Sequence, residues 1–430
     1  MTDHLTSADR DPSPASAETA LHRTAPPAKL LIPVLILAAF GLYLASLAPA
    51  IITLAIRITG VDPEGKTVAL STVVLVGALV QILALPLCGA LSDRTGGRFG
   101  RRRPWLVGGA VAGLVGLGIA GSVPSLAGIV VGYAIASIGY SAAFAGFLPL
   151  IPEFVPDHLR ARLSGMIGFV VAFAVLAAVW LGSQLAMFPL LLLTLPAMVG
   201  VLAALLLAAV IRKVDRPLAI SWPRFGPREF AASYWLRTGG DRDFTWNWLS
   251  RLLVGVAYVG VQTYAVYFLT DTAGLSTEAA AGQYAQITAI STPVSIVCFL
   301  LSGFLSDRLG RRKAFVVVGA LLIGVALVIA AVTQSLSGFL VAFLVLTVGQ
   351  AIYLTVDIAI AAAVVPDDTQ AGKAMSVYQV ATVLPNVVAP LAAVAVLAVS
   401  GGANYSAFFL VLAVAAALSA VTVLFVRRIR

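Results

Sequence analysis

Two charged side chains, Arg251 and Asp357, lie deep within apolar stretches of the chain. Leaving either charge in lipid would cost roughly 2.5 to 3.5 kcal/mol even on the mildest insertion scale, so each needs a partner. Both lie at a similar distance from the polar end of their stretch, and we therefore expect them to pair. A carboxylate beside a guanidinium can bind a proton or lose its partner to a competing ligand, which predicts a coupling or binding site. A static structural ion pair is the alternative interpretation.

Helical spacing places other polar side chains on the same faces as these two. The positions i, i+7 and i+11 of one stretch and i, i+3 and i+7 of another share a face: Arg251, Tyr258 and Gln262, and Gln350, Tyr353 and Asp357. Two earlier stretches add hydroxyl groups: Tyr43 and Ser46, and Tyr133, Ser137, Tyr140 and Ser141. Hydroxyls, amides and aromatic rings together suit a polyhydroxylated ring as ligand. For any single one of them, packing between helices is the alternative.

The elements that position these residues follow from composition. The chain is 60% hydrophobic and 11% charged, whereas about a quarter of a soluble domain is charged. A spanning helix needs roughly 20 mostly apolar residues. Twelve such runs are present, and their continuity excludes long lipid-spanning strands: 30–55, 67–91, 104–122, 126–152, 163–184, 188–211, 244–270, 279–305, 314–333, 337–364, 375–399 and 405–426. The sequence therefore predicts an all-α membrane protein with twelve transmembrane helices.

Lysine and arginine are distributed unevenly among the connecting loops. The loops after the even-numbered runs carry nearly all of them, whereas the opposite loops hold only Arg57 and Lys66. By the positive-inside rule, the first set and both termini face the cytoplasm. The net charge of +9 reflects this asymmetry, so we expect no nucleic-acid partner. Abundant Arg, Ala, Val and Gly indicate a GC-rich bacterial genome, and hence a multi-pass protein of the bacterial inner (cell) membrane.

Polar segments divide the chain into predicted domains. Residues 1–29 are rich in Ser, Thr, Ala and Pro and predict a disordered cytoplasmic tail. The polar, Pro- and Gly-containing segment 212–243 predicts a cytoplasmic linker between an N-terminal six-helix bundle, 30–211, and a C-terminal one, 244–426. Residues 427–430 form a short cytoplasmic tail.

Residues for metal or nucleotide chemistry are not arranged in recognisable sites. The histidines His4, His22 and His158 lie in the tail or a loop, and Cys88 and Cys298 lack a CxxC or His neighbour. A phosphate-binding glycine loop ending in Lys-Ser or Lys-Thr is missing from the sequence, as is a set of nucleophile, base and orienting residue. We therefore expect neither an enzyme nor a cofactor.

A short motif recurs at corresponding places in the two halves. GALSDRTGG begins at Gly89 after the second run, and GFLSDRLGRR begins at Gly303 after the eighth. A glycine there allows a helix to approach closely, an aspartate can face a helix N-terminus, and arginines can bridge to acidic groups of the facing half. Topology signals alone are the alternative for the arginines. The predicted gating residues are Gly89, Asp93, Arg94, Arg98, Arg101, Arg102, Gly303, Asp307, Arg308, Arg311 and Arg312.

Twelve predicted helices in two repeated halves, with GALSDRTGG and GFLSDRLGRR, resemble the major facilitator superfamily over residues 29–430. The resemblance implies two six-helix bundles that rock about a midplane site, with helices 1, 4, 7 and 10 lining a central cavity. It also implies that Asp93 faces the start of helix 11 near Met375 and Ser376. Asp307 would likewise face the start of helix 5, near Leu163 and Ser164.

Within that superfamily, RFGRRRPW at residues 98–105 and the stretch at residues 366–390 resemble sucrose-proton symporters and the related glycoside-pentoside-hexuronide branch. Plant sucrose symporters have a functional acidic residue in helix 4, whereas residues 126–151 contain none. We therefore expect a secondary active transporter in the lipid bilayer that takes up a small-molecule sugar or glycoside with the proton as coupling ion, and we expect it to be monomeric. Proton-antiport efflux of amphipathic compounds is the alternative within transport, and a non-transporting receptor is the alternative outside it.

Overall fold

The computed structural model describes residues 28–96, 99–155, 157–213, 215, 242–363, 378, 380–398 and 404–427. Most of the predicted tail, 1–29, and most of the predicted linker, 212–243, lie outside these residues. Ala28 and Lys29 of the tail, and Arg242 and Asp243 of the linker, are helical. Within the described part the regular elements are helices, and twelve of them are long and apolar enough to span a membrane. The predicted all-α class with twelve spans is confirmed.

The first half begins with a broken helix, in which α2 (Ala28–Ala48) continues through the π-helical turn η1 (Pro49–Thr53) into α3 (Leu54–Thr59). It continues with α4 (Lys66–Arg94), α5 (Arg103–Ser122), α6 (Leu126–Phe147), the short α7 (Leu150–Phe154), α8 (Asp157–Gln184), α9 (Pro189–Val210) and the 3-10 turn η2 (Ile211–Lys213). The second half contains α11 (Arg242–Ala273), α12 (Thr277–Leu309), α13 (Arg312–Thr333), α14 (Leu336–Ala363), α16 (Pro385–Ala393), the π-helical turn η4 (Val394–Ala398) and α17 (Tyr405–Leu424).

Several helices extend beyond the predicted apolar runs. Helix α8 begins at Asp157, six residues before the predicted start, and α12 ends at Leu309 rather than at residue 305. Hydropathy marks the apolar part of a helix, whereas an acidic residue at its start and a basic residue at its end continue the helix favourably into the polar interface. The predicted fourth helix is instead interrupted at Leu148 and Pro149, between α6 and α7.

Local capping chemistry sets several of these ends. Ser125, Ser276 and Asn404 precede α6, α12 and α17, and each side chain accepts a hydrogen bond from a backbone N–H three residues further on. These bonds satisfy a donor that the first helical turn leaves open. Gly310 adopts a left-handed conformation with φ of 62° and ends α12, as glycine does without steric cost.

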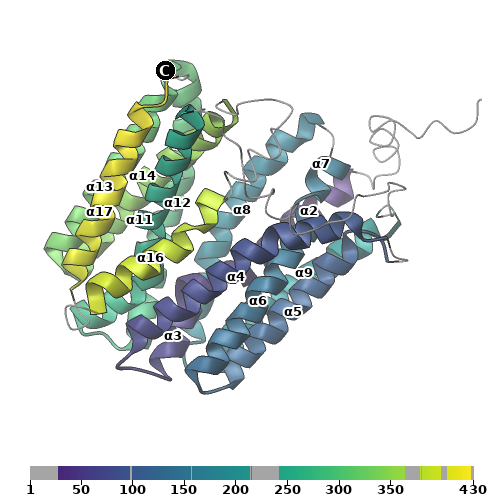
Figure 1. Ribbon diagram of the computed structural model, residues 1–430, viewed down its shortest axis with the longest axis horizontal. Coiled ribbons are helices and arrows are strands. Elements are labelled where there is room, and N and C mark those ends of the chain that lie inside the picture. The colour runs from purple at the N-terminus through teal and green to yellow at the C-terminus, as the bar shows by residue number, and fades with distance from the viewer. Residues whose placement is uncertain are drawn as a thin grey trace, which may run out of the picture.

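The two halves pack as two groups of helices (Figure 1), with α2, α4, α5, α6 and α9 together and α11, α12, α13, α14 and α17 together. Two pairs of helices cross between the groups: α4 packs against α16, and α8 packs against α12. The α3 segment also contacts α11 and α12. A relative movement of the two halves would change the contacts between these helices.

Glycine packing repeats between the halves at an offset of 210 residues, which is also the offset between Arg101 and Arg311. Gly89 and Gly303 are 214 residues apart because the first copy of the motif carries four additional residues, 96–99. A Cβ on Gly109 of α5 would lie 2.5 Å from the carbonyl oxygen of Gly139 on α6. The equivalent Gly319 of α13 would place a Cβ 2.8 Å from the carbonyl oxygen of Gly349 on α14. Such distances require that these positions carry no side chain, since the helix backbones touch there. The internal repeat is therefore present in the packing as well as in the loop motif.

Candidate functional site

Arg251 and Asp357 form an ion pair inside the second half. Arg251 Nη1 on α11 lies 2.6 Å from Asp357 Oδ2 on α14. The Asp357 side chain is completely buried and that of Arg251 is 14% exposed. Because an isolated charge at this depth would be costly, the pairing explains how both residues are tolerated. The predicted pairing of these two residues is confirmed.

Tyr378 adds a third group to this pair. Its hydroxyl donates to the same Asp357 Oδ2, and its ring centroid lies 5.8 Å from the guanidinium carbon of Arg251. The other carboxylate oxygen, Asp357 Oδ1, is buried without a hydrogen-bond partner among the described residues. Asn247 lies one turn before Arg251, with its side-chain amide close enough to Asp357 to favour the ionised carboxylate, although the geometry of a hydrogen bond is not met. Oδ2 therefore accepts two hydrogen bonds, whereas Oδ1 is buried near the Asn247 amide.

A group of hydroxyls adjoins the ion pair on the neighbouring helices. Ser250 Oγ lies 2.8 Å from the Tyr353 hydroxyl and 2.8 Å from Ser419 Oγ. Ser419 Oγ also donates to the backbone oxygen of Ser250 at 3.0 Å. Tyr353 is therefore held by α11 and α17, one turn from Asp357, and is fully buried. Its placement fits a role in packing the helices around the ion pair.

A second polar cluster lies further along α11. Gln262 Nε2 donates to the Tyr258 hydroxyl at 2.5 Å, and the Tyr284 hydroxyl of α12 donates to Gln262 Oε1. Gln350 on α14 has a buried side-chain oxygen without a hydrogen-bond partner among the described residues. The structure thus brings Tyr258 and Gln262 together as predicted and adds Tyr284, while Gln350 is not bonded to them.

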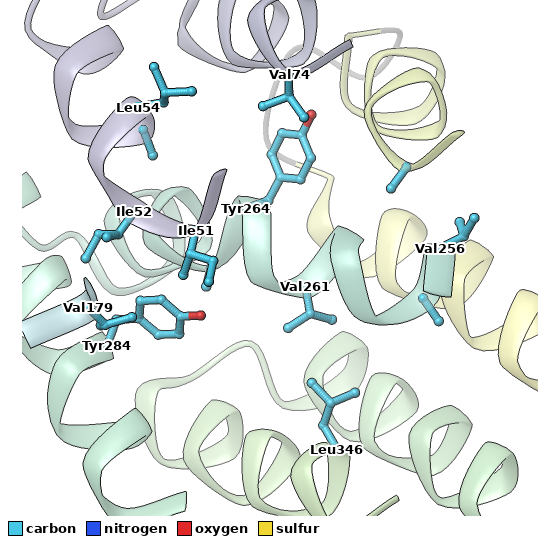
Figure 2. Close-up of a cluster of buried hydrophobic side chains, with 14 of the residues drawn as sticks. Ile51, Ile52, Leu54, Val74, Val179, Val256, Val261, Tyr264, Tyr284 and Leu346 are labelled. Carbon is cyan, nitrogen blue, oxygen red and sulfur yellow. The ribbon is translucent and has the colours of Figure 1, made fainter. Parts of the chain in front are cut away.

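Apolar side chains from both halves meet around α11 (Figure 2). Ile51 and Val74 of the first half belong to the same buried cluster as Val256, Val261 and Leu346 of the second. In Figure 2 the ring of Tyr264 projects from α11 toward Val74. The part of the contact between the halves drawn in Figure 2 is therefore mainly apolar.

The predicted hydroxyl residues of the first half pack against glycines and rings. Tyr133 and Ser137 of α6 lie against Gly77 of α4, where a Cβ would be 2.3 Å from the Tyr133 ring. Tyr140 lies in the same way against Gly113 of α5, and its hydroxyl is buried without a partner among the described residues.

Tyr43 of α2 contacts the Phe144 ring of α6, with ring centroids 5.0 Å apart. Ser46 Oγ bonds to a backbone oxygen of its own helix, and so does Ser141 Oγ. These contacts fit the packing alternative better than a shared binding face with Arg251 and Asp357.

The first copy of the repeated motif forms an ion network within the first half. Arg102 Nη2 lies 2.6 Å from Asp93 Oδ1 and 2.6 Å from Glu153 Oε1, and Arg101 Nη2 also contacts Glu153. The arginines were expected to bridge to the facing half, whereas among the described residues the carboxylates that Arg101 and Arg102 contact belong to their own half. The acidic partner is supplied by α7 of the same half, which the break after α6 places beside the loop. Their burial also shows that they are more than topology signals.

Asp215 fixes the backbone of this arginine loop. Its carboxylate accepts hydrogen bonds from the backbone N–H groups of Arg101, Arg102 and Arg103 at 2.9 to 3.1 Å. Gly100 has a φ of 90°, and a Cβ there would lie 2.4 Å from Asp215, so glycine is required. Burial lowers the pKa of Arg102, but the hydrogen bond and charge of Glu153, followed by those of Asp93, outweigh this and raise it above its ordinary value. Arg102 therefore remains charged.

The remaining motif residues are less constrained. Among the described residues, a Cβ on Gly89 would meet nothing within 4 Å, so the close approach expected there stays a prediction. Gly303 does allow a close approach, to Thr355 of α14 in its own half. Arg94 Nη1 donates to the Ala90 backbone oxygen at 2.8 Å.

Other predicted motif contacts cannot be followed in the described part of the chain. Arg308 and Arg311 are exposed, and Arg312 is half-buried. Arg98, Met375, Ser376 and the side chains of Asp307 and Ser164 lie outside the described residues. The predicted contacts of Asp93 and Asp307 with the starts of helices 11 and 5 therefore stay predictions.

Among the described residues, the polar contacts between the halves lie at the end of the molecule away from the arginine loop, which we call the opposite end and define by Lys66, Ser71 and Asp271. Lys66 Nζ pairs with Asp271. Ser71 Oγ of α4 lies 2.5 Å from the Tyr264 hydroxyl of α11, and the Tyr267 hydroxyl donates to the Ala55 backbone oxygen at 3.0 Å. The arginine-loop end, defined by Arg101, Arg102 and Asp215, is called the basic end below.

Sequence reasoning missed Glu153, Asp215, Asp271, Tyr284 and Tyr378. A usable signal existed for the acidic residues, because each is an isolated carboxylate close to the end of an apolar run, where a basic partner would be expected. For the two tyrosines no comparable signal existed, since a tyrosine in an apolar helix most often serves packing.

The sequence matches the family model described as Major Facilitator Superfamily over residues 31–298 and 281–430. Among proteins of curated function, none matches significantly. A bacterial homologue of the human lysosomal transporter Spinster, solved inward-facing and occupied, has a TM-score of 0.71 at 16% identity, covering 94% of this chain and 97% of the other.

A peptide transporter POT in complex with sulfate has a TM-score of 0.71 at 14% identity, with 95% of this chain and 97% of the other covered. A mutant of the nucleoside transporter NupG has a TM-score of 0.69 at 15% identity, with 92% and 99% covered. At these identities the likeness shows the fold alone. The family match spans nearly all of the described helices, and the chain therefore belongs to the Major Facilitator Superfamily.

Proposed function

We propose that this protein is a secondary active transporter that takes up a sugar or glycoside together with protons by alternating access. The observation that carries the proposal is the buried Arg251 and Asp357 pair, 2.6 Å apart, in which Asp357 Oδ1 has no hydrogen-bond partner among the described residues. A buried ionisable residue in a membrane span is a functional-site candidate by default, and here its partner is identified. A proton that binds Oδ1 would neutralise the carboxylate and weaken its hold on Arg251.

Coupling then follows from the charge balance of the pair. With Asp357 ionised, the pair is neutral and compact. With Asp357 protonated, Arg251 carries an unbalanced charge in an apolar region, and a polar substrate can supply the missing acceptor. Proton and substrate would therefore favour the same conformation, which is the requirement for symport.

The substrate class rests on the second polar cluster. Tyr258, Gln262 and Tyr284 present two hydroxyls and an amide beside aromatic rings, which together suit a sugar ring. The resemblance of residues 98–105 and 366–390 to sucrose-proton symporters and the glycoside-pentoside-hexuronide branch supports the same class. At the 210-residue offset the residue of the first half that corresponds to Asp357 is Phe147, and residues 126–151 contain no acidic residue. The acidic residue of this transporter would thus be in the second half only.

Orientation and location complete the proposal. The basic end would face the cytoplasm, because nearly all loop arginines gather there. Both termini would then be cytoplasmic, in the bacterial inner membrane, and the protein would act as a monomer without a cofactor other than the coupling proton.

Proton-antiport efflux of an amphipathic compound is the second candidate, and one observation favours it. The region where the halves meet is lined mainly by apolar residues such as Ile51, Val261 and Leu346. An amphipathic molecule would gain from contact with this surface, while Asp357 served as the proton-binding acid.

Uptake of a panel of labelled mono- and disaccharides into proteoliposomes under an imposed inward proton gradient tests the proposal. We expect accumulation by the unsubstituted protein, loss of accumulation in Asp357→Asn, and retention of exchange between internal and external sugar in that variant. Glu278→Gln, at an exposed position in the first turn of α12, serves as the matched carboxylate control. Gradient-driven movement of amphipathic dyes without sugar accumulation would favour the efflux candidate instead.

A further inference from the structure

Arg251 and Asp357 belong to the same half of the molecule, so their charge state alone does not move one half against the other. Both lie on helices, α11 and α14, that pack within the second group. A residue that links the ion pair to a helix crossing between the halves is needed if protonation is to change access. Tyr378 has this position.

We infer that Tyr378 transmits the charge state of Asp357 to the contact between α16 and α4. Its hydroxyl donates to Asp357 Oδ2, which also binds Arg251 Nη1 at 2.6 Å. Tyr378 is only 4% exposed, so little of its hydroxyl's hydrogen-bonding capacity is available to solvent, and losing the bond to Asp357 would cost free energy. Tyr378 acts as a positioning residue here. This inference rests on the proposed alternating access, but it is independent of the substrate.

The link from Tyr378 to the other half is short. Tyr378 precedes by two residues the span Val380–Leu397, which contains α16. Helix α16 packs against both α11 and α4, the latter belonging to the first half. One turn beyond Arg251, Gly255 meets Pro385 so closely that a Cβ would lie 2.5 Å from the proline ring. The span is therefore held at the ion pair by Tyr378 and at the neighbouring turn by Pro385.

This arrangement gives protonation a mechanical consequence. While Asp357 is ionised, it accepts hydrogen bonds from Tyr378 and Arg251 on one oxygen and ties the span of α16 to α11 and α14. A proton on Oδ1 removes the negative charge, and the charge-assisted bond from Tyr378 weakens to an ordinary one. The Pro385 contact remains, so the span can pivot there and change its contact with α4. Protonation in one half would thus alter the interface between the halves.

The groups that face Asp357 limit what else could respond to pH. Arg251 faces it from α11, Tyr378 faces it from the span of α16, and Tyr353 lies one turn away on its own helix. From α12, Ser302 bonds to Thr355 of α14, and from α13, Gly319 packs against Tyr353. Arginine and tyrosine keep their protons at neutral pH, so Asp357 is the group in this set whose charge would change.

Distance measurements between spin labels on α4 and on the span of α16 test the inference without a substrate. Leu91 and Thr382 are exposed and can be replaced by cysteine in a background of Cys88→Ser and Cys298→Ser. The labelled full chain is reconstituted in lipid nanodiscs and measured in buffers from mildly acidic to mildly alkaline. In the parent we expect the distance distribution to change with pH, and in Asp357→Asn we expect no change.

Tyr378→Phe keeps the ring beside Arg251 and removes only the hydroxyl. The pH-dependent change in the distance distribution corresponds to a change in the ratio of two conformations of the α16 span. We expect Tyr378→Phe to reduce the pH-dependent change in this ratio about tenfold, as loss of a hydrogen bond to a charged group implies. Combining it with Asp357→Asn should add nothing, because both remove the same link. Ser419→Ala removes a buried hydroxyl of the same half that touches neither Arg251 nor Asp357, and should behave as the parent.

A full pH response in Tyr378→Phe, a parent insensitive to pH, or additive effects in the double variant would each overturn the inference. Transport by the same proteins separates this result from the proposed function. If sugar uptake is driven by the proton gradient but Tyr378→Phe leaves the pH response of the spin-label distances unchanged, only the inference about Tyr378 is overturned. The expected distances without any sugar uptake remove the sugar assignment and leave the inference standing.

Discussion

Lys66 and Asp271 join the two halves at the opposite end of the molecule. Lys66 begins α4 and Asp271 lies near the end of α11, and their side chains are 17% and 22% exposed. Lys66 Nζ also lies 3.1 Å from Thr270 Oγ1, while the Tyr405 hydroxyl donates to Asp271 Oδ2 at 2.8 Å. Opening of this end must separate Lys66 from Asp271, because the two residues belong to different halves.

Lys66→Ala should therefore favour the conformation that is open at this end. Val74 is 2% exposed beside Tyr264 and provides a reporter as Val74→Cys in a background without native cysteines. We expect its reaction with a membrane-impermeant maleimide to become about threefold to tenfold faster, since a partly exposed pair with added hydrogen bonds contributes on the order of 1 kcal/mol. The measurement is the labelling rate in proteoliposomes.

Exchanging the two charges is the control for this prediction. The double variant Lys66→Asp with Asp271→Lys restores an attraction between the halves and should return the labelling rate toward that of the parent. Equal rates in the parent and in Lys66→Ala would show that the pair does not hold the opposite end closed.

Glu153→Gln should destabilise the first half. Glu153 pairs with both Arg101 and Arg102, whose side chains are 7% and 4% exposed. Removing one partner of a buried pair typically costs about 3 to 5 kcal/mol. We expect a value toward the lower end, because Arg102 keeps Asp93 and the Ser92 hydroxyl. Thermal unfolding of the purified protein in detergent should show a melting temperature lower by several degrees.

Glu278→Gln is the matched control for Glu153→Gln, since it makes the same chemical change at an exposed helix start. Its melting temperature should stay close to that of the parent. A similar loss in both variants would mean that the network around Glu153 contributes little beyond general surface electrostatics.

Much of the fold is readable from the sequence because its physical cause is local. Twelve apolar runs, the uneven arginines and the repeated motif each depend on a few neighbouring residues, and the structure confirms the twelve spans. The pairing of Arg251 with Asp357 was also predictable, since few partners exist for a charge at such depth. The glycine contact between Gly109 and Gly139 was not predicted, although its repeat at Gly319 and Gly349 is visible once the offset is known.

The rest of the site could not be predicted because it depends on tertiary contacts. Tyr378 lies 21 residues from Asp357 in sequence, and Glu153 lies 51 residues from Arg102. Nothing in a helical period specifies which tyrosine or glutamate will approach a given charge. The arginines were expected to pair with residues of the other half. The turn at Pro149 instead places Glu153 beside Arg102, which thus has an acidic partner within its own half.

Asp215→Ala should loosen the arginine loop. The Asp215 carboxylate is 6% exposed and accepts backbone hydrogen bonds at the start of α5, so its removal leaves several donors open. Loss of such a cap costs on the order of 1 to 2 kcal/mol. Limited trypsin digestion should cleave within Arg101 to Arg103 faster than in the parent, as detected by mass spectrometry. Asp215→Asn retains one acceptor oxygen, so its cleavage rate should lie between those of the parent and Asp215→Ala. An unchanged cleavage rate in Asp215→Ala would contradict the role of Asp215 in fixing the loop.

Gly109→Ala and Gly319→Ala should both destabilise the protein, and the first should do so more. A Cβ on Gly109 would lie 2.4 Å from the Ala143 nitrogen, whereas one on Gly319 would lie 2.8 Å from the Gly349 oxygen and the Tyr353 nitrogen. In each case the obstacle is backbone, so the helices must move apart, at about 1 to 3 kcal/mol. The adjacent Gly108 faces open space, and Gly108→Ala should leave the melting temperature nearly unchanged. If Gly108→Ala lowered the melting temperature as much as Gly109→Ala, helix contact at the repeated glycines would not be the cause.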